Sequence, residues 1–514
     1  MSVAPTAARR SRLTALLDLI ERVGNRLPNP VTLFVILAVV VLIASALASG
    51  LGLSVAHPRT GEPISAVNLL TREGVQRMFT QAVNNFTGFA PLGTVLVALI
   101  GIGVAERSGL FAALLRALVA AVPAWAVTPT VVFAGIMSNV ASDAGYLILP
   151  PVAAALFASL GRHPVAGVTA AFAGVAAGFS ANLLPGTIDV LLAGLTQEAT
   201  RLIDLDHRIE VVANWYFMCA SVPVLVCVGW FVNTRFVERR LGPWTPPQQQ
   251  AAEEPPHPAE GRALGISGIA FLGTLLGLGL LVVPSWGPLR AAGDTTLAQI
   301  RPFMDGMVAV VLIAFFVPGL AFGLATGKIR RDHDVAKMTG DTMAGMGSYI
   351  VLAFAAAQFV AYFRWSNLGT ILAVGLADLL KALHFSGAPL FIAFILVATT
   401  VNLFISSASA KWTAFAPVFV PMFMLLGYSP EACQAMYRVG DSVTNVVTPL
   451  NPYLPLVLAY LHRYDPRMGL GSIIALMLPF SIAFGVVWSA MVVAWLMLGW
   501  PVGPGADLGY AVTP

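Results

Sequence analysis

Four polar side chains near residue 440 have a spacing that would bring them together in one binding site. Arg438, Asp441, Asn445 and Thr448 are separated by three, four and three positions, so an α-helix would carry them on one face. A guanidinium in such apolar surroundings can receive a substrate carboxylate, because ionisable groups inside apolar segments usually mark substrate or ion pathways. The alternative is that Arg438 and Asp441 simply neutralise one another.

Other candidate residues lie in similarly apolar surroundings. Trp412 could stack on an aromatic substrate, or it could pack in the core or anchor the chain at a membrane interface. Asp143 and Asp189 are candidate ligands for an ion or a proton, and the alternative for each is a helix-capping carboxylate. Lys411 could extend toward the membrane surface or pair with a nearby aspartate. The histidines form no metal-ligand pattern.

Two stretches of the chain resemble each other at an offset of 266 residues. The matched positions follow one another without a gap, and they are 143–146 with 409–412, Pro151 with Pro417, 160–161 with 426–427, Pro164 with Pro430, and Gly174 with Gly440. Transporters are often built from such repeats, with interrupted helices that meet at the substrate. We therefore predict two copies of one unit, with inverted topology as the expected relation.

Each copy contains a polar patch and, later, a polar break that includes proline. The patches are 138–143 and 402–411, and the breaks are 178–189 and 444–452. Unwound backbone is tolerated at membrane depth only beside protein or a water-filled cavity, so each patch predicts the tip of a re-entrant hairpin that faces its break. Oxygen atoms at such junctions suit a coupling cation, with sodium expected and a proton as the alternative. The candidate sodium ligands are Asn139, Ser142, Asp143, Asn182, Ser407 and Asn445.

The composition decides what kind of protein must position these residues. Of its 514 residues, 57% are hydrophobic and 11% are charged, and the mean hydropathy is +0.81. A soluble protein cannot bury this much apolar surface, so a water-soluble enzyme is excluded. The runs 33–53 and 473–500 are continuously apolar, unlike the alternating strands of a porin barrel. The predicted fold class is an all-α polytopic membrane protein, and a scattered net charge of +4 argues against nucleic-acid binding.

The apolar segments also predict how the chain is organised. Several of them are shorter than the roughly 20 residues that cross a bilayer, so broken helices are expected beside full spans. Basic clusters at 9–12, 235–240 and 328–331 place these regions, and with them the N-terminus, on the cytoplasmic side. The predicted parts are a cytoplasmic segment 1–30, a first half 31–235 with a hairpin near 139–160, a cytoplasmic proline-rich linker 236–263, a second half 264–500 with a hairpin near 405–427, and a tail 501–514.

Short segments in both halves occur in a specific order. They are 23–30 (VGNRLPNP), 90–93 (APLG) leading to 101–110 (GIGVAERSGL), 142–146 (SDAGY), 178–182 (GFSAN) and 409–412 (SAKW). In this order and density they resemble the AbgT family of p-aminobenzoyl-glutamate transporters. The resemblance runs from about residue 20 to residue 500, and it is weakest in 53–88 and 241–262.

This resemblance implies a homodimer in the bacterial inner membrane, with about nine transmembrane helices and two re-entrant hairpins per subunit. It implies a secondary transporter of p-aminobenzoyl-glutamate, a folate breakdown product, or of related antimetabolites such as sulfonamides. The substrate-binding positions carried over residue by residue are Asn402, Ser409, Trp412, Pro430, Arg438, Asp441 and Asp189. An anionic aromatic substrate would place a carboxylate on Arg438 and its ring on Trp412, with Asp441 holding the guanidinium in position.

Two other functions compete with this interpretation. A sodium-coupled symporter of di- or tricarboxylates would use the same broken-helix repeats, and the role of Trp412 distinguishes the two substrates. An intramembrane amide hydrolase would need a nucleophile beside a base, but the sequence has no G-x-S-x-G motif and no histidine near the polar breaks. We therefore expect a transporter and not an enzyme.

Overall fold

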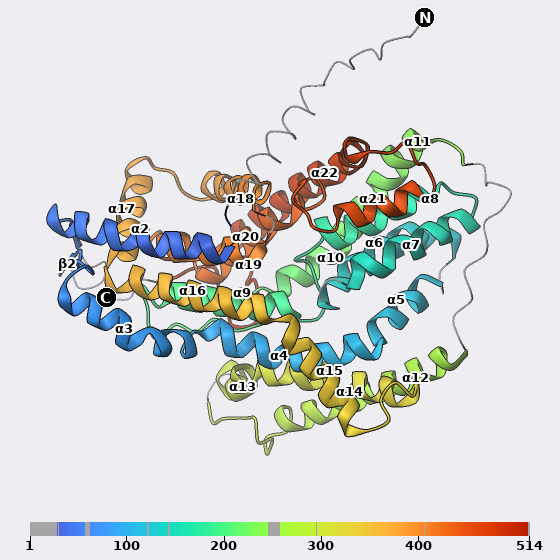
Figure 1. The fold of residues 1–514 in the computed structure, drawn as a ribbon, viewed down its shortest axis with the longest axis horizontal. Helices are drawn as coiled ribbons and strands as arrows, with labels where there is room; N and C mark the ends of the chain where they lie inside the picture. Colours follow the sequence, from blue (N-terminus) through green and yellow to red (C-terminus); the bar gives the residue numbers. More distant parts are fainter. Residues whose placement is uncertain are drawn as a thin grey trace, which may run out of the picture.

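The computed structural model describes residues 28, 30–56, 62–120, 123–141, 144–244, 258–293, 296–405 and 407–511. Within these ranges the chain is an elongated bundle of helices (Figure 1). A short antiparallel hairpin of β1 (Ser54–Ala56) and β2 (Pro63–Ser65) lies at one end of the bundle, and α11 (Glu238–Leu241) lies at the other. The all-α polytopic prediction is confirmed.

Eight helical segments of the described chain are long and apolar enough to cross a membrane. They are Pro30–Gly50, Arg72–Ser108, Trp215–Leu241, Glu260–Val282, Met307–Ala325, Gly347–Trp365, Ala408–Leu425 and Leu470–Met497. Shorter apolar helices occupy Ala124–Ser138, Gly145–Ser159, Pro164–Ala177 and Ala388–Asn402. The mixture of full-length and short helices agrees with the expected broken helices, whereas the count of nine spans stays a prediction.

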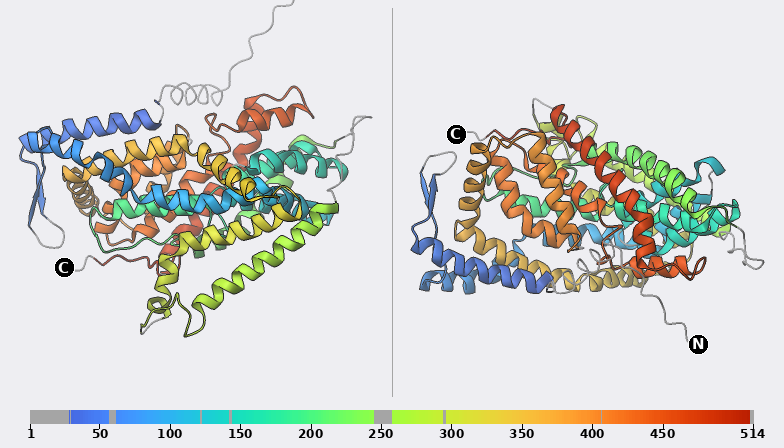
Figure 2. Two further views of the ribbon diagram at one scale, coloured as in Figure 1. Left: turned by 60° about the horizontal axis from the view of Figure 1, so that its bottom comes forward. Right: turned by 90° about the horizontal axis from the view of Figure 1, so that it is seen from above.

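The outer helices of both halves surround the helices formed by the two matched stretches of sequence. On one side, α4 (Ala90–Ser108) packs against α14 (Met307–Ala325), which in turn packs against α12 (Pro258–Val282), and α12 runs along the edge of the molecule (Figure 2). On the other side, α2 (Pro30–Gly50) and α3 (Arg72–Thr87) pack against α16 (Gly347–Trp365). The remaining connecting helices are α5 (Leu110–Ala120), α13 (Thr296–Asp305), α15 (Asp332–Gly345) and α17 (Leu368–Ala382).

The two matched stretches of sequence form the same series of elements. In the first half, α6 (Val127–Ser138) breaks before α7 (Ala144–Ser159), and α8 (Pro164–Phe172) ends in a π-helical turn (Ala173–Ala177). The unwound 178–186 segment follows, and then α9 (Thr187–Thr200) and α10 (Trp215–Val232). In the second half, α18 (Ala388–Asn402) breaks before α19 (Ala408–Leu425), followed by α20 (Pro430–Val443), α21 (Leu454–His462) and α22 (Leu470–Met497). The predicted hairpin ranges cover each break and its second helix. That these hairpins are re-entrant and the repeats inverted stays a prediction.

The interior helices α8 and α20 are placed by their first residues. Pro164 and Pro430 each occupy the first turn, where a missing N–H costs nothing and the fixed φ favours the helix. The Ser429 hydroxyl accepts a hydrogen bond from the Ala432 N–H at 3.2 Å and caps α20. Every residue of both helices is buried. The core of each half is therefore a helix that has no face toward lipid.

Matching glycines let these core helices approach their hairpins. A Cβ at Gly174 would lie 2.5 Å from the Val132 carbonyl oxygen of α6, and a Cβ at Gly440 would lie 2.7 Å from the Ile395 carbonyl oxygen of α18. Gly174 and Gly440 are also matched by the 266-residue offset. The similarity between the halves thus includes a close backbone contact at the same place in each half.

We expect Gly440→Ala to destabilise the protein, because the new methyl group meets backbone that cannot move aside, and overpacking typically costs about 1–3 kcal/mol. Gly375→Ala is the matched control, since Gly375 lies in α17 with nothing within 4 Å of a Cβ. That control should gain about 0.5–1 kcal/mol from helix propensity. Thermal unfolding in detergent measures both, and equal melting temperatures for the two variants would contradict the packing argument.

Candidate functional site

A buried ion pair joins the two halves at the centre of the bundle. Arg438 of α20 donates through Nη1 to Asp189 Oδ1 at 2.7 Å, and its Nη2 donates to the Ser180 carbonyl at 2.7 Å. The second oxygen of Asp189 accepts hydrogen bonds from the Asn182 amide at 2.7 Å and the Gly186 N–H at 2.8 Å. The unwound 178–186 segment thus supplies both a carbonyl for the guanidinium and donors for the carboxylate. Asp189 is a helix-capping carboxylate and an ion-pair partner at once.

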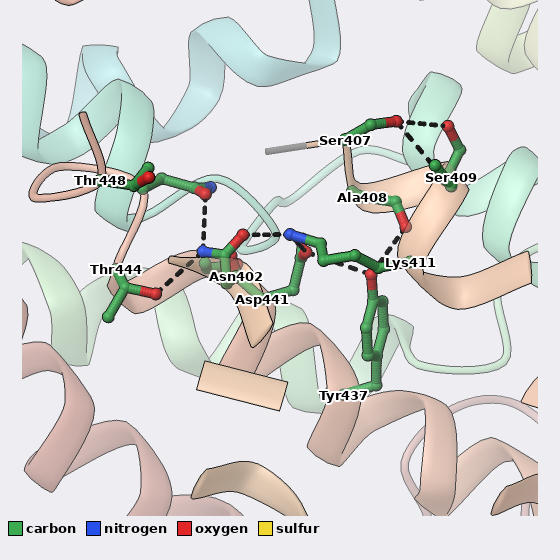
Figure 3. A network of polar contacts seen from close by, with 12 residues as sticks. Asn402, Ser407, Ala408, Ser409, Lys411, Tyr437, Asp441, Thr444 and Thr448 are labelled. Atoms are coloured by element: carbon green, nitrogen blue, oxygen red, sulfur yellow. Dashed lines mark hydrogen bonds and ion pairs between the residues drawn. The ribbon is translucent and has the colours of Figure 1, made fainter. Parts of the chain in front are cut away.

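A second buried ion pair lies within the second half. Lys411 of α19 contacts Asp441 at 2.6 Å, and the two side chains are 1% and 2% exposed. Figure 3 shows Lys411 reaching between Asp441 and the side-chain oxygen of Asn402, while the Tyr437 hydroxyl, 3.1 Å from Asp441 Oδ1, donates to the Ala408 carbonyl at 2.7 Å. Of the two interpretations of Lys411, pairing with an aspartate is the one that the structure shows.

These contacts overturn the expected pairing of Arg438 with Asp441. Three positions along a helix turn the side chain by about 60°, so the two groups point to different neighbours. Arg438 turns toward the 178–186 segment and Asp441 turns toward α19. A buried charge is stable only when it is paired and hydrogen-bonded, and each group has found a partner on another element. Asp441 does not hold the guanidinium; Asp189 does.

Trp412 lies beside the second ion pair. It is fully buried, its ring stacks on that of Tyr437 with centroids 4.3 Å apart and planes at 26°, and its indole N–H donates to Thr196 Oγ1 at 2.9 Å. In this conformation Trp412 therefore packs in the core with one ring face covered. Stacking on a substrate stays a prediction, and it requires the Tyr437 ring or the indole to move.

A chain of hydrogen bonds leads from Trp412 toward the end of α9. Thr196 Oγ1 lies 2.6 Å from Gln434 Oε1, and the Gln434 amide donates to Asn214 Oδ1 at 2.9 Å. Asn214 then donates to the backbone carbonyl of Glu431 at 2.8 Å. The Glu431 carboxylate lies 2.9 Å from His207 Nε2, and this contact raises the pKa of His207. The orientation of the indole is thereby tied to the loop between α9 and α10.

The second hairpin tip brings together most of its predicted residues. The Asn402 amide contacts the Asp441 carbonyl at 2.6 Å, Thr444 Oγ1 at 2.9 Å and Asn445 Oδ1 at 2.8 Å. Ser407 and Ser409 face each other at 3.2 Å, and Ser407 caps α19. The predicted site residue Pro430, however, begins α20 about 12 Å along the helix axis from Arg438. Its place in the structure is that of a helix start, away from the two ion pairs.

Unsatisfied oxygens lie at the end of α6 and in the unwound 178–186 segment. Among the residues that the structure describes, the buried Asn139 Oδ1, Ser180 Oγ and Asn182 Oδ1 have no hydrogen-bond partner. Asn139 ends α6, and its amide donates to the Ile136 carbonyl at 3.2 Å. Such orphaned oxygens usually indicate a bound water or ion. The predicted ligands Ser142 and Asp143 lie outside the described residues.

Sequence reasoning missed several residues that complete the site. Ser180 contributes through its backbone carbonyl, which no side-chain pattern identifies. Tyr437 directly precedes Arg438, and its position between Trp412 and Asp441 depends on how α19 and α20 pack. Thr196 and Gln434 lie among other polar residues of α9 and α20, so nothing in the sequence distinguishes them from their neighbours.

The Arg438–Asp189 pair gives a direct test by double-mutant cycle. We expect Arg438→Gln and Asp189→Asn each to lower the free energy of unfolding by about 3–5 kcal/mol, because each leaves one buried charge without its partner. The double variant should be more stable than the sum of the two losses predicts, since it leaves no unpaired charge. Thermal unfolding of the four proteins in detergent measures the coupling. Strictly additive losses would show that the two groups do not interact.

Comparisons with known proteins agree with this architecture. The model of the AbgT putative transporter family matches residues 15–510. The p-aminobenzoyl-glutamate transport protein of Escherichia coli K12 is 40% identical over 507 residues, which cover 98% of each chain. The YdaH transporter of Alcanivorax borkumensis has a TM-score of 0.88 and 43% identity, covering 93% of this chain and 100% of that one. Neisseria gonorrhoeae MtrF, described among antimetabolite efflux pumps, has a TM-score of 0.90 and 42% identity, covering 97% of this chain and 100% of that one.

The family match therefore spans nearly the whole chain, and two solved structures share its fold at more than 40% identity. The expectation that this protein is a transporter and not an enzyme is confirmed. The chain is a multi-pass membrane protein that belongs to the AbgT transporter family.

Proposed function

We propose that this protein is a secondary active transporter of p-aminobenzoyl-glutamate and related folate catabolites or antimetabolites, coupled to a cation gradient. The names of its relatives support this substrate class. The observation that carries the proposal is the buried Arg438–Asp189 pair between the two halves, because a guanidinium at that place can exchange one carboxylate for another. The substrate offers two carboxylates and an aromatic amide, which suit Arg438 and the Trp412–Tyr437 pair.

The ion pair also supplies a reason for cation coupling. A substrate carboxylate that binds Arg438 takes the place of Asp189, which then remains buried without a counter-charge. An uncompensated buried carboxylate costs several kcal/mol, so a proton or a sodium ion must accompany the exchange. Binding of substrate and cation is thereby linked through one residue, and the linkage is reciprocal.

The unsatisfied oxygens at the first hairpin support sodium as the coupling ion. Asn139 at the end of α6, and Ser180 and Asn182 in the unwound segment whose Asn182 amide binds Asp189, offer neutral oxygens of the kind that a hard cation binds. The corresponding place at the second hairpin is different, because the Lys411 ammonium occupies the space between Asp441 and Asn402. We therefore propose a sodium site at the first hairpin and a fixed internal cation at the second. Ser407 and Asn445, the candidate sodium ligands there, then serve the hydrogen-bonded frame around Lys411.

A di- or tricarboxylate symporter is the second candidate. The burial of Trp412 against Tyr437 favours it, since in this conformation neither ring is free to receive an aromatic substrate. Assembly as a homodimer, location in the bacterial inner membrane and a cytoplasmic N-terminus remain parts of the proposal that rest on the family and on the basic clusters.

Uptake by purified protein in liposomes tests the substrate. We expect labelled p-aminobenzoyl-glutamate to be transported in response to an imposed sodium or proton gradient, with unlabelled substrate and a sulfonamide as competitors. Trp412→Ala should reduce this transport at least tenfold, whereas Trp412→Phe should retain part of it through its ring. Transport of succinate in place of p-aminobenzoyl-glutamate, unaffected by Trp412→Ala, would establish the dicarboxylate function instead.

The sodium site can be tested without substrate. Sodium should raise the melting temperature of the wild type relative to potassium at equal ionic strength, because a ligand that binds only the folded state stabilises it. Asn182→Ala should abolish this difference. The matched control is Asn233→Ala, which removes a buried amide at the far end of α10 and should retain the difference. A sodium-dependent shift that survives in Asn182→Ala would exclude this site.

A further inference from the structure

An open cavity lies on the other side of α9 from the central ion pair. It has a volume of about 530 Å³ and is bounded by α9, the loop that leads to α10, and the α13–α14 turn. Three arginines line it: Arg201 at the end of α9, Arg208 in the loop and Arg301 in α13. The cavity is large enough for a drug-sized molecule, since ligand pockets generally measure about 300–1,000 Å³.

Helix α9 is the wall between this cavity and the central site. Val190, Ala193, Gly194, Gln197 and Arg201 line the cavity, and their spacing is that of one helix face. Asp189 and Thr196 on the same helix bind Arg438 and Trp412 instead. A molecule in the cavity would therefore contact the same helix that carries Asp189 of the ion pair. The α9–α10 loop is also fixed to this helix, because Gln197 donates to the His207 carbonyl at 2.9 Å and accepts from the Ile209 N–H at 2.8 Å.

More basic than acidic side chains line the cavity, with three arginines against two carboxyl groups. Arg201 is paired with Glu198 at 2.6 Å, whereas none of the ion pairs found among residues 30–511 of the described chain involves Arg208 or Arg301. Two carboxyl groups, Glu210 and Asp305, also line the cavity and are hydrogen-bonded to each other. Burial, and then the nearby Asp305, raise the pKa of Glu210, while Arg301 and Arg208 oppose this shift.

We propose that this cavity is an anion-docking subsite, in which Arg208 and Arg301 hold the carboxylates of a dicarboxylate substrate before or after it occupies the central site. The identity of the substrate in this inference rests on the proposed function. Guanidinium groups bind carboxylates through paired hydrogen bonds, and both arginines are exposed enough to receive them from solution. The loop end of α10 is opposite to its basic end at 235–240, so the subsite lies on the outer side under the predicted orientation.

Transport kinetics test the subsite. The double variant Arg208→Gln/Arg301→Gln should raise the KM for p-aminobenzoyl-glutamate at least fivefold. Its maximal transport rate should change little, because the residues of the central site are unaltered. The corresponding double lysine variant keeps the charges and should recover part of the affinity. Arg72→Gln is the matched control, as Arg72 is an exposed arginine at the start of α3 that does not line the cavity, and its KM should stay at the wild-type value. High salt should reduce the difference between wild type and variant, since exposed charges are screened.

Protection from chemical modification locates the bound anion directly. In wild-type protein, p-aminobenzoyl-glutamate should slow the reaction of Arg208 and Arg301 with phenylglyoxal, read by mass spectrometry of their peptides, and leave Arg72 unprotected. The same protection should persist in Arg438→Gln, whose central site is disabled.

The outcomes separate this inference from the proposed function. Failure of wild-type protein to transport p-aminobenzoyl-glutamate under either gradient would overturn the proposed substrate. Normal wild-type transport, with an unchanged KM in the double glutamine variant and no protection of Arg208 or Arg301, would overturn the docking subsite alone. A fall in maximal rate with unchanged KM and a lower melting temperature would assign the two arginines a structural role and equally overturn the subsite. If the double variant folds poorly, the KM and maximal rate of each single glutamine variant test the subsite in the same way.

Discussion

The cost of burying charge organises the centre of this protein. Arg438, Asp189, Lys411 and Asp441 are all nearly inaccessible to solvent, and each would be strongly destabilising without its partner. Both pairs require precise placement of elements that are distant in sequence. The unwound 178–186 segment must reach α20, and the tip of the second hairpin must present Lys411 to the same helix. The broken helices, the capping prolines and the close glycine contacts all serve this placement.

The polar groups at the two helix breaks also differ in how far their hydrogen bonds are satisfied. Around the first break the oxygens of Asn139, Ser180 and Asn182 have no hydrogen-bond partner among the described residues, and a bound water or ion would satisfy them. At the second hairpin the amide of Asn402 and the ammonium of Lys411 satisfy their neighbours. The two repeats have kept a common backbone plan while their polar centres have diverged, with Ser409 and Lys411 standing where the first copy has Asp143 and Gly145. One centre is suited to exchange ligands and the other to remain fixed.

The sequence predicted correctly those features that depend on a single segment of the chain. Continuous apolar runs identified the membrane fold, and the polar patches located the helix breaks before α7 and α19 within a few residues. The sequence did not predict contacts between side chains on different helices. The helical spacing placed Arg438 and Asp441 on one helix, but this helix ends at Val443, before Asn445 and Thr448. The choice of partner depended on Asp189 and Lys411, which approach from elsewhere. The sequence likewise did not predict the contact of the Ser180 carbonyl with Arg438 or the stacking of Tyr437 on Trp412, because only the packed structure brings these groups together.

The balance of the central charges has an electrical consequence. Two cationic and two anionic side chains make the empty site neutral, provided that all four are ionised. If the site moves relative to the bilayer during transport, its return in the empty state carries no net charge through the membrane potential, which acts at about 2.3 kcal/mol per elementary charge per 100 mV. Under the proposed function, only the form loaded with a dianion and its accompanying cations is then sensitive to voltage. The number of cations that travel with each substrate would therefore decide alone whether the cycle generates a current, and in which direction.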